Sequence, residues 1–245
     1  LKAAARKLIA QVVAQITERL KPKLLNAFSG RRAAHRRSMQ AVARNFARQG
    51  TVRANLRHYD RERQQLVIER PRFVARQRRA LPWRVILVVD QSGSMIDSVM
   101  HAAIMASILT ALPGVDPRLL VFDTGVADLS AYAQDPVEVL MTVQLGGGTD
   151  IGRAMKAAEA LVEQPRRTVI TLISDFYEGA PASPLLATVA RLREAGVTLM
   201  GLAALDEQQQ PEYDHGLAQR LVALGMPVAA LSPQRFAEWL AEVMG

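Results

Sequence analysis

The stretch "VILVVDQSGSM", residues 85–95, decides how the rest of the sequence is interpreted. It begins as an unbroken apolar run, which is typical of a strand buried on both faces of a sheet. The run stops at Asp90, and two hydroxyl side chains follow at alternate positions, Ser92 and Ser94. A carboxylate and two hydroxyls at the end of a core strand indicate either a helix cap or the first part of a binding site.

From residue 83 onward, apolar runs of this kind alternate with helical patterns. The predicted strands are 84–90, 117–123, 126–132, 168–175, 197–205 and 227–231, and the predicted helices are 98–112, 135–143, 150–164, 183–196, 213–225 and 232–244. Such alternation predicts an α/β fold with a doubly wound, mostly parallel sheet flanked by helices. Sheets of this type place their sites outside the carboxyl ends of the strands.

The first third of the chain has a different character. Residues 1–82 hold 21 Lys and Arg but only 4 Asp and Glu, a net charge of +17, whereas residues 83–245 carry −9. The apolar spacing predicts helices over 1–20 and 31–50, followed by an extended connector with an edge strand at Leu66–Glu69. We therefore expect a basic, mainly helical N-terminal extension over 1–82 and an α/β domain over 83–245.

Composition excludes several classes of protein. The chain has no cysteine, so it holds no disulfide and no thiolate metal site, which fits a cytoplasmic protein. Charged residues interrupt every apolar run before the roughly 18–20 residues that a membrane span requires, so no membrane span is predicted. The sequence begins with Leu1 rather than Met, which leaves open that residues before it are missing.

Two later segments carry polar residues to the same predicted edge of the sheet. The strand over 168–175 ends at Asp175, and the glycine-rich loop "LGGGTDIG" over 145–152 carries Thr149. If the strands that end at Asp90 and Asp175 are neighbours, two carboxylates and three hydroxyls converge in one crevice.

All of these side chains are hard oxygen donors, which suit Mg²⁺, with Mn²⁺ or Ca²⁺ as alternatives, and argue against zinc. The three hydroxyls would bind the ion directly. The two aspartates would bind it directly or hold its water ligands, and Gly148 and Asp150 are further candidates in the supporting loop. With few charged ligands, the ion would keep a position open for a carboxylate from a partner.

Simpler interpretations exist for parts of this set. Asp90 with the two serines could cap the following helix, and Asp150 could do the same for the helix over 150–164. The glycine loop is not followed by Gly-Lys-Ser/Thr, so it is not a Walker phosphate loop. The sequence also lacks a Gly-x-Ser-x-Gly motif, so neither Ser92 nor Ser94 has the context of a hydrolase nucleophile.

The combined pattern resembles the von Willebrand factor A (VWA) domain. The sequence has Asp-x-Ser-Gly-Ser, then Gly-Gly-Thr-Asp, then a strand ending in Ile-Ser-Asp, and it is similar in these elements and their order to the metal-ion-dependent adhesion site of that family. The resemblance covers residues 83–245. It implies that the metal-site residues are Asp90, Ser92, Ser94, Thr149 and Asp175.

The Arg-rich segment ahead of the first strand narrows the resemblance to bacterial CoxE-like VWA proteins. These typically act with MoxR-type AAA+ ATPases. The resemblance implies a non-enzymatic protein that binds other proteins through a divalent metal, as adaptor of such an ATPase in the maturation of a metal centre or complex. The partner ATPase or a client protein would supply an acidic side chain to the ion.

Two other functions are kept as alternatives. A metal-dependent phosphoester hydrolase would need a general base near Asp175, and only Asp150 and Glu178 are close enough in sequence. A nucleic-acid-binding protein would use the basic N-terminal segment, but its aromatic residues show no spacing typical of base stacking. For that segment we favour docking on an acidic surface, either of a partner protein or of the remainder of this chain. A solvated helical face is the second interpretation, and nucleic-acid binding is the least favoured.

Overall fold

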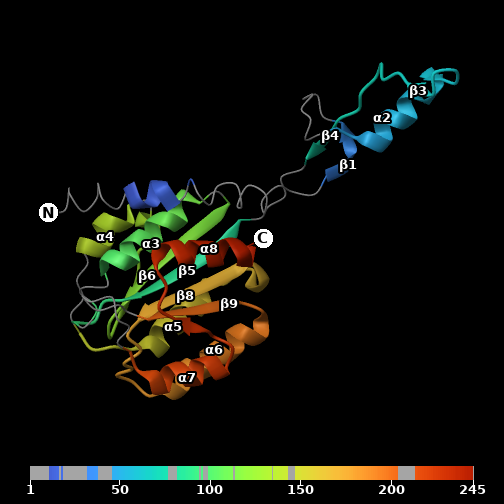
Figure 1. Cartoon of the computed structure of the whole chain (residues 1–245). Coiled ribbons are helices and arrows are strands. Elements are labelled where there is room, and N and C mark those ends of the chain that lie inside the picture. The colour runs from blue at the N-terminus through green and yellow to red at the C-terminus, as the bar shows by residue number, and fades with distance from the viewer. Residues whose placement is uncertain are drawn as a thin grey trace. The chain divides into compact units, whose positions relative to one another are not determined.

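The computed structural model separates the chain into two compact units. One unit comprises Leu1–Leu24 with Leu81–Gly245, and the other comprises Leu25–Ala80 (Figure 1). The residues that the structure describes are 11–16, 18, 32–37, 46–76, 82–93, 95, 99–112, 114–133, 135–142, 147–203 and 213–244. The first 24 residues thus group with the larger unit, whereas the expected division placed all of 1–82 in an extension. The functional division at residue 82 stays a prediction.

The larger unit is built on a six-stranded sheet in the order β10-β9-β8-β5-β6-β7. The strands are β5 (Trp83–Asp90), β6 (Val115–Phe122), β7 (Val126–Asp128), β8 (Thr168–Ser174), β9 (Thr198–Ala203) and β10 (Val228–Ala229). Neighbouring strands run parallel except β7, which forms an antiparallel hairpin with β6. Strands β5 and β8 are direct neighbours, as the site prediction required.

Helices cover both faces of this sheet. They are α3 (Val99–Ala111), α4 (Pro136–Thr142), α5 (Ile151–Ala160), α6 (Ala182–Ala195), α7 (His215–Ala223) and α8 (Pro233–Met244). Helix α3 packs against α4 and α8, and α6 packs against α5 and α7. Figure 1 shows these two groups on opposite faces of the sheet. The predicted doubly wound α/β fold is therefore confirmed.

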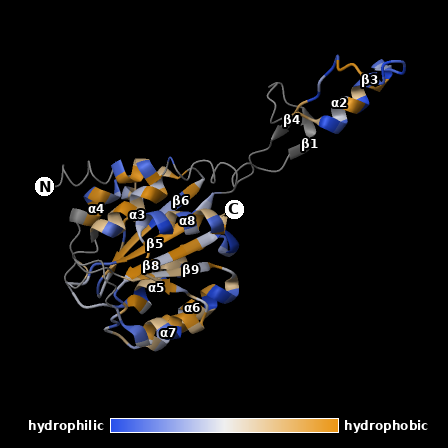
Figure 2. Ribbon diagram, viewed as in Figure 1, coloured by the Kyte–Doolittle hydropathy of each residue, from blue (hydrophilic) through white to orange (hydrophobic). Residues whose placement is uncertain are grey.

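The central strands are buried on both faces, which explains their unbroken apolar sequences. Residues 85–89 of β5 are at most 1% exposed, and every residue of β8 is buried. Figure 2 shows these strands as the hydrophobic centre of the unit. Burial of such runs removes a large apolar area from water, at about 25 cal/mol per Å². The polar residues that follow the strands are held at the rim of this rigid core.

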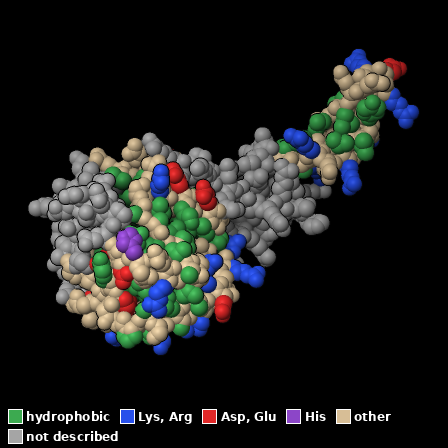
Figure 3. Space-filling model, turned by 60° about the horizontal axis from the view of Figure 1, so that its bottom comes forward, with side chains coloured by type: hydrophobic (Ala, Val, Ile, Leu, Met, Phe, Trp, Pro, Cys, Tyr) green, Lys and Arg blue, Asp and Glu red, His purple; other side chains and the backbone are tan. Residues whose placement is uncertain are grey.

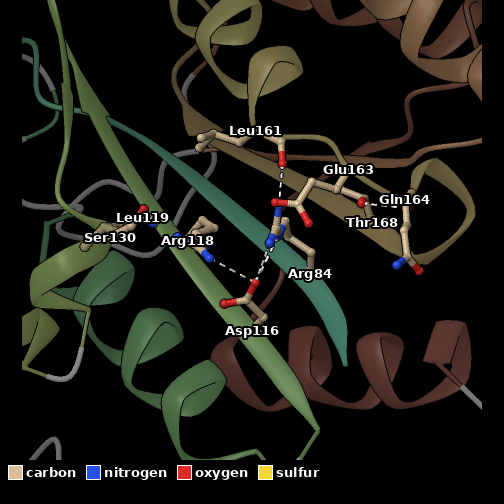
Figure 4. A network of polar contacts seen from close by, with 9 residues as sticks. All are labelled: Arg84, Asp116, Arg118, Leu119, Ser130, Leu161, Glu163, Gln164 and Thr168. Carbon is tan, nitrogen blue, oxygen red and sulfur yellow. Dashed lines mark hydrogen bonds and ion pairs between the residues drawn. The ribbon is translucent and has the colours of Figure 1, made fainter. Parts of the chain in front are cut away.

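A charged network holds the opposite edge of the sheet, where the strands begin (Figure 4). Arg84, near the start of β5, lies 2.9 Å from a carboxylate oxygen of Asp116 in β6 and 2.7 Å from one of Glu163. It also donates a hydrogen bond of 2.9 Å to the carbonyl of Leu161. These contacts tie β5 to β6 and to the segment that precedes β8. The network thus holds β5 and β6 together at the start of the strands, at the opposite end of β5 from Asp90.

In the smaller unit, the predicted helix over 31–50 is wrong. Residues Arg32–Arg37 form strand β1, which pairs antiparallel with β4 (Val74–Arg76), and helix α2 spans Arg48–Asn55. Residues 38–45 lie outside the described residues. The local pattern favoured a helix, but pairing with a segment some forty residues away overrides such weak local preferences. Gly50, the last residue of the predicted helix, lies inside α2.

A polar centre organises this unit. The buried side chain of Asn55 donates to the carbonyls of Thr51 and Arg70 and accepts the backbone N–H groups of Glu69 and Arg70. All of its hydrogen-bonding capacity is thereby used, which fixes the return of the chain along α2. The expected edge strand at Leu66–Glu69 is confirmed only at Leu66, because β3 (Gln65–Leu66) pairs with β2 (Tyr59–Asp60) over two residues.

The surface of the smaller unit is both apolar and basic. Figure 3 shows hydrophobic side chains gathered on one of its faces, with Lys and Arg side chains around them. The large hydrophobic side chains exposed there are Val52, Leu56, Tyr59, Val67 and Ile68. Residues 46–76 carry eight Arg against three Asp and Glu.

Candidate metal centre

Asp90 is the last residue of β5, and its side chain is fully buried at 0% exposure. One carboxylate oxygen accepts a 2.6 Å hydrogen bond from the hydroxyl of Ser174, and the other accepts a 2.9 Å bond from the backbone N–H of Ser92. Burial raises the pKa of Asp90, and the nearby charge of Asp175 raises it further, although these hydrogen bonds lower it in part. A nearby cation would relieve the cost of this buried charge.

Asp175 lies directly after β8, the neighbour of β5, and is 5% exposed. One of its carboxylate oxygens accepts the backbone N–H of Tyr177 at 3.1 Å. Its backbone carbonyl accepts the N–H of Asp214 at 2.9 Å. Because β5 and β8 are neighbouring parallel strands, Asp90 and Asp175 follow one another across the same edge of the sheet.

Phe176, the residue after Asp175, holds the backbone of this segment in place. Phe176 has a backbone φ of 61°, in the left-handed region that non-glycine residues rarely adopt. Its ring is fully buried and meets the ring of Tyr213 edge-on, with centroids 6.2 Å apart. Its N–H donates to the hydroxyl of Ser174 at 2.9 Å, and that same hydroxyl donates to Asp90. Strain of this kind persists where surrounding packing enforces it, which is common at functional sites.

The segment that carries Ser92 turns directly after β5. Ser92 is buried, and its carbonyl accepts the N–H of Met95 at 2.9 Å. Gly93 is exposed. Ser94, the second predicted hydroxyl ligand, lies outside the described residues. Ser92 is thus held beside Asp90, at the start of the loop that leads to α3.

The glycine loop reaches the same edge. The carbonyl of Thr149 accepts a 3.0 Å hydrogen bond from the N–H of Gly179, four residues after Asp175. Gly148 is exposed. Asp150 caps α5, because its carboxylate accepts the N–H of Arg153 at 2.8 Å. The helix-capping interpretation of Asp150 is therefore correct, and a supporting role toward a metal stays a prediction.

The sequence analysis missed two residues at this edge. Ser174 supplies the hydroxyl that bonds Asp90, and Asp123 follows β6, the other neighbour of β5. The signal for Asp123 was present, because it ends an apolar strand in the same way as Asp90 and Asp175 do. No comparable signal existed for Ser174, whose bond depends on where its hydroxyl points.

The donor set fits a hard divalent cation. Two buried carboxylates and the hydroxyls of Ser92 and Thr149 come from segments that the fold brings together at one edge. Within the described part of the chain, no three or more His, Cys, Asp or Glu side chains gather as a metal-binding group. A site here would accordingly combine few carboxylates with neutral oxygens and water, as Mg²⁺ prefers.

Glu178, one of the two candidate general bases of the hydrolase alternative, is engaged elsewhere. Its carboxylate accepts the N–H of Ile151 at 2.9 Å, in the first turn of α5. Burial raises the pKa of Glu178 to about 7, and the charge of Asp150 adds to this, while bonds from backbone N–H groups lower it in part. The side chain thus joins the segment after β8 to the start of α5.

This raised pKa predicts a pH-dependent stability. Between about pH 4.5 and 7 the folded protein keeps a proton on Glu178 that the unfolded chain has lost, so stability falls as pH rises through this window. The whole shift corresponds to about 3 kcal/mol, and solvent screening of this half-buried group reduces it to about 1–2 kcal/mol. Urea denaturation in EDTA at pH 5 and pH 8 measures the loss. Glu178→Gln, which keeps an acceptor for Ile151, should lose less stability, and an identical pH dependence in both proteins would contradict the assignment.

The family follows from comparison with known proteins. A sequence model described as "VWA domain containing CoxE-like protein" matches residues 16–240. The chain belongs to this family. Proteins with VWA domains commonly bind a divalent metal.

A relative from Escherichia coli (strain K12) extends the likeness over nearly the whole chain. The uncharacterized protein YehP is 49% identical over 241 residues, which is 98% of this CoxE-like chain. The chain spans 64% of the length of that relative. The aligned residues therefore include both compact units.

Solved structures share the fold. An aerotolerance-related membrane protein from Bacteroides fragilis, with 15% identity and a TM-score of 0.53, matches 66% of this chain and 98% of its own. The manganese-loaded TRAP protein of Plasmodium vivax, with 14% identity and a TM-score of 0.51, matches 68% of this chain and 74% of its own. At such identities the likeness concerns the VWA fold alone. Among the described helices of the present chain, none has the length and apolar character needed to cross a membrane.

Proposed function

We propose that this protein binds other proteins through a divalent cation held at the carboxyl edge of its sheet. The observation that carries this proposal is the pair of buried carboxylates, Asp90 and Asp175, at the ends of the neighbouring strands β5 and β8. Mg²⁺ is the favoured ion, with Mn²⁺ or Ca²⁺ as alternatives.

The roles follow from the chemistry of each side chain. Ser92, Ser94 and Thr149 bind the ion directly through their hydroxyls, and Asp90 and Asp175 bind it directly or through its water ligands. Neutral hydroxyls donate little charge, so the ion remains electrophilic and accepts a carboxylate from a partner. Nearby exposed backbone, including Gly93, Gly147 and Gly148, gives a protruding acidic side chain room to approach.

The partner that we propose is a MoxR-type AAA+ ATPase, a client protein of that ATPase, or both, in the cytoplasm. The resemblance to CoxE-like proteins motivates the ATPase, and the open metal position motivates an acidic side chain. The apolar and basic surface of the smaller unit supports docking on a protein, because four of its five exposed large hydrophobic side chains are aliphatic. Nucleic acids are contacted instead through phosphates and aromatic stacking.

A hydrolytic role has less support. The carboxylate of Glu178 is bound to the start of α5, and that of Asp150 caps the same helix. Both carboxylates are thus engaged at the start of α5, and we assign them to holding that helix rather than to catalysis. We infer that the ion serves binding rather than catalysis.

The test uses a purified MoxR-type ATPase, chosen as one whose gene lies beside that of this chain. We expect it to bind the full chain in 5 mM MgCl₂ and to be released by EDTA, as measured by biolayer interferometry. The Asp175→Asn variant should lose the Mg²⁺-dependent part of the signal. Binding that is equal in Mg²⁺ and EDTA would overturn the proposal, and steep salt-dependent binding of RNA that is lost on deleting residues 1–80 would favour the nucleic-acid alternative.

A further inference from the structure

Asp123 is a third carboxylate at the edge where Asp90 and Asp175 lie. Strand β6 pairs with β5 so that Phe122 stands opposite Asp90, and Asp123 is the next residue. It is half-buried. It approaches the glycine loop from β6, on the side of β5 opposite to β8.

Its hydrogen bonds engage the glycine loop at two points. One carboxylate oxygen accepts the N–H of Gly125 at 2.7 Å, and the other accepts the N–H of Gly147 at 3.2 Å. The backbone carbonyl of Asp123 accepts the N–H of Asp150 at 2.9 Å. The two points of attachment in the loop, Gly147 and Asp150, lie on either side of Thr149.

The packing around these bonds is close. A Cβ atom added at Gly147 would lie 2.8 Å from a carboxylate oxygen of Asp123, so a larger residue would displace that carboxylate. Arg153 of α5 donates a 3.0 Å hydrogen bond to the carbonyl of Thr124, which ties the same turn to the helix that follows the loop. The turn after β6 and the segment after β8 therefore hold the Thr149 loop from two sides.

We propose that Asp123 is a positioning residue that fixes Thr149 for the cation, without being a ligand itself. Both of its carboxylate oxygens already accept backbone N–H groups, so its charge serves the loop. The inference rests on the proposed function, since it assigns Asp123 a part in the same metal site. A turn residue of purely structural importance would stabilise the hairpin of β6 and β7 without affecting the ion.

The test compares Asp123→Ala with Thr149→Val and with the double variant, in the full chain. We expect Asp123→Ala to lower Mg²⁺ affinity about tenfold by calorimetry, as loss of a supporting group around a metal typically does. The double variant should bind no more weakly than Thr149→Val alone, because Asp123 then has no ligand to position. Asp123→Asn keeps one acceptor and should recover part of the affinity. In EDTA, the amides of Gly147 and Asp150 should exchange hydrogen faster in Asp123→Ala.

Asp128→Ala is the matched control, because the carboxylate of Asp128 accepts the N–H of Ser130 at 2.9 Å in the same local way, but Asp128 is exposed at the end of β7. It should leave Mg²⁺ affinity unchanged. Unchanged affinity in both Asp123 variants would overturn the inference, as would additive losses in the double variant, which would make Asp123 an independent ligand. If the wild-type chain binds no Mg²⁺, the proposed function fails as well, whereas binding by wild type and equally by Asp123→Ala overturns this inference alone.

Discussion

Asp90→Asn abolishes Mg²⁺ binding while leaving the protein folded; this is the largest effect that we expect. The substitution keeps the size of the side chain and removes only its charge. Asp90 is fully buried and lies near Asp175, so only a cation bound close to it can compensate its charge. We expect the Mg²⁺ affinity to fall by at least about a hundredfold in calorimetry, beyond the typical effect of losing a supporting group. Asp90→Ala, Asp175→Ala and Asp175→Asn should behave in the same way.

The apo protein should tolerate the change. Burial raises the pKa of Asp90, so its charge is a cost in the absence of a cation. An Asn side chain can still accept the N–H of Ser92 and donate to the hydroxyl of Ser174, so the free energy of unfolding in EDTA should change by about 1 kcal/mol or less. Mg²⁺ should raise the melting temperature of the wild type and not that of the variant, since only ligands that bind the folded state stabilise it.

The exposed Asp128→Asn substitution controls for loss of one negative charge, and it should retain full affinity. Unaltered Mg²⁺ affinity in Asp90→Asn would mean that the ion lies elsewhere on the molecule. A large loss of stability in EDTA would instead mean that the carboxylate of Asp90 serves the fold through its bonds to Ser92 and Ser174. The two outcomes are separated because affinity and unfolding are measured independently.

The sequence predicted the site where general rules of topology apply. Carboxyl ends of parallel strands meet at one edge of a sheet, so Asp90 and Asp175 could be assigned to the same edge. That their strands are direct neighbours is seen only in the structure. The same rule applied to Asp123 at the end of the third run, but its role depends on a bond to Gly147, 24 residues further along the chain. A hydrogen bond between residues so far apart in the chain leaves no periodic pattern in the sequence.

The local sequence pattern predicted the wrong structure where helix preference competes with long-range strand pairing. The helical spacing over 31–50 was real, but β1 forms because Arg32–Arg37 pairs with Val74–Arg76. A helical pattern that is rich in Arg has no apolar face large enough to fix it against such pairing. In the larger unit the apolar runs were buried on both faces, so local pattern and tertiary packing agreed, and the predicted strands and helices lie close to the observed ones.

Gly179→Ala should damage the metal site although Gly179 has no side chain to contribute. A Cβ atom at this position would lie 2.7 Å from the carbonyl oxygen of Thr149, closer than such atoms approach, and the obstacle is backbone. The 3.0 Å hydrogen bond from the N–H of Gly179 to that carbonyl must then lengthen. Binding sites require their ligands within about 0.5 Å of the productive position, so the hydroxyl of Thr149 would be misplaced. We expect Mg²⁺ affinity to fall about thirtyfold and the free energy of unfolding by about 1–3 kcal/mol.

Gly93→Ala provides the contrasting case, because it changes a glycine between Ser92 and Ser94 where an added Cβ meets nothing within 4 Å. Removal of backbone freedom from the unfolded chain should leave its stability equal or slightly higher, and its Mg²⁺ affinity should stay within about twofold of wild type. Calorimetry and urea denaturation on both variants make the comparison. If Gly93→Ala loses affinity and Gly179→Ala does not, then the backbone contact between the segment after β8 and the Thr149 loop does not control the site. The reverse result would show that Gly179 supports the site from outside the sequence motif, by holding one backbone carbonyl in place.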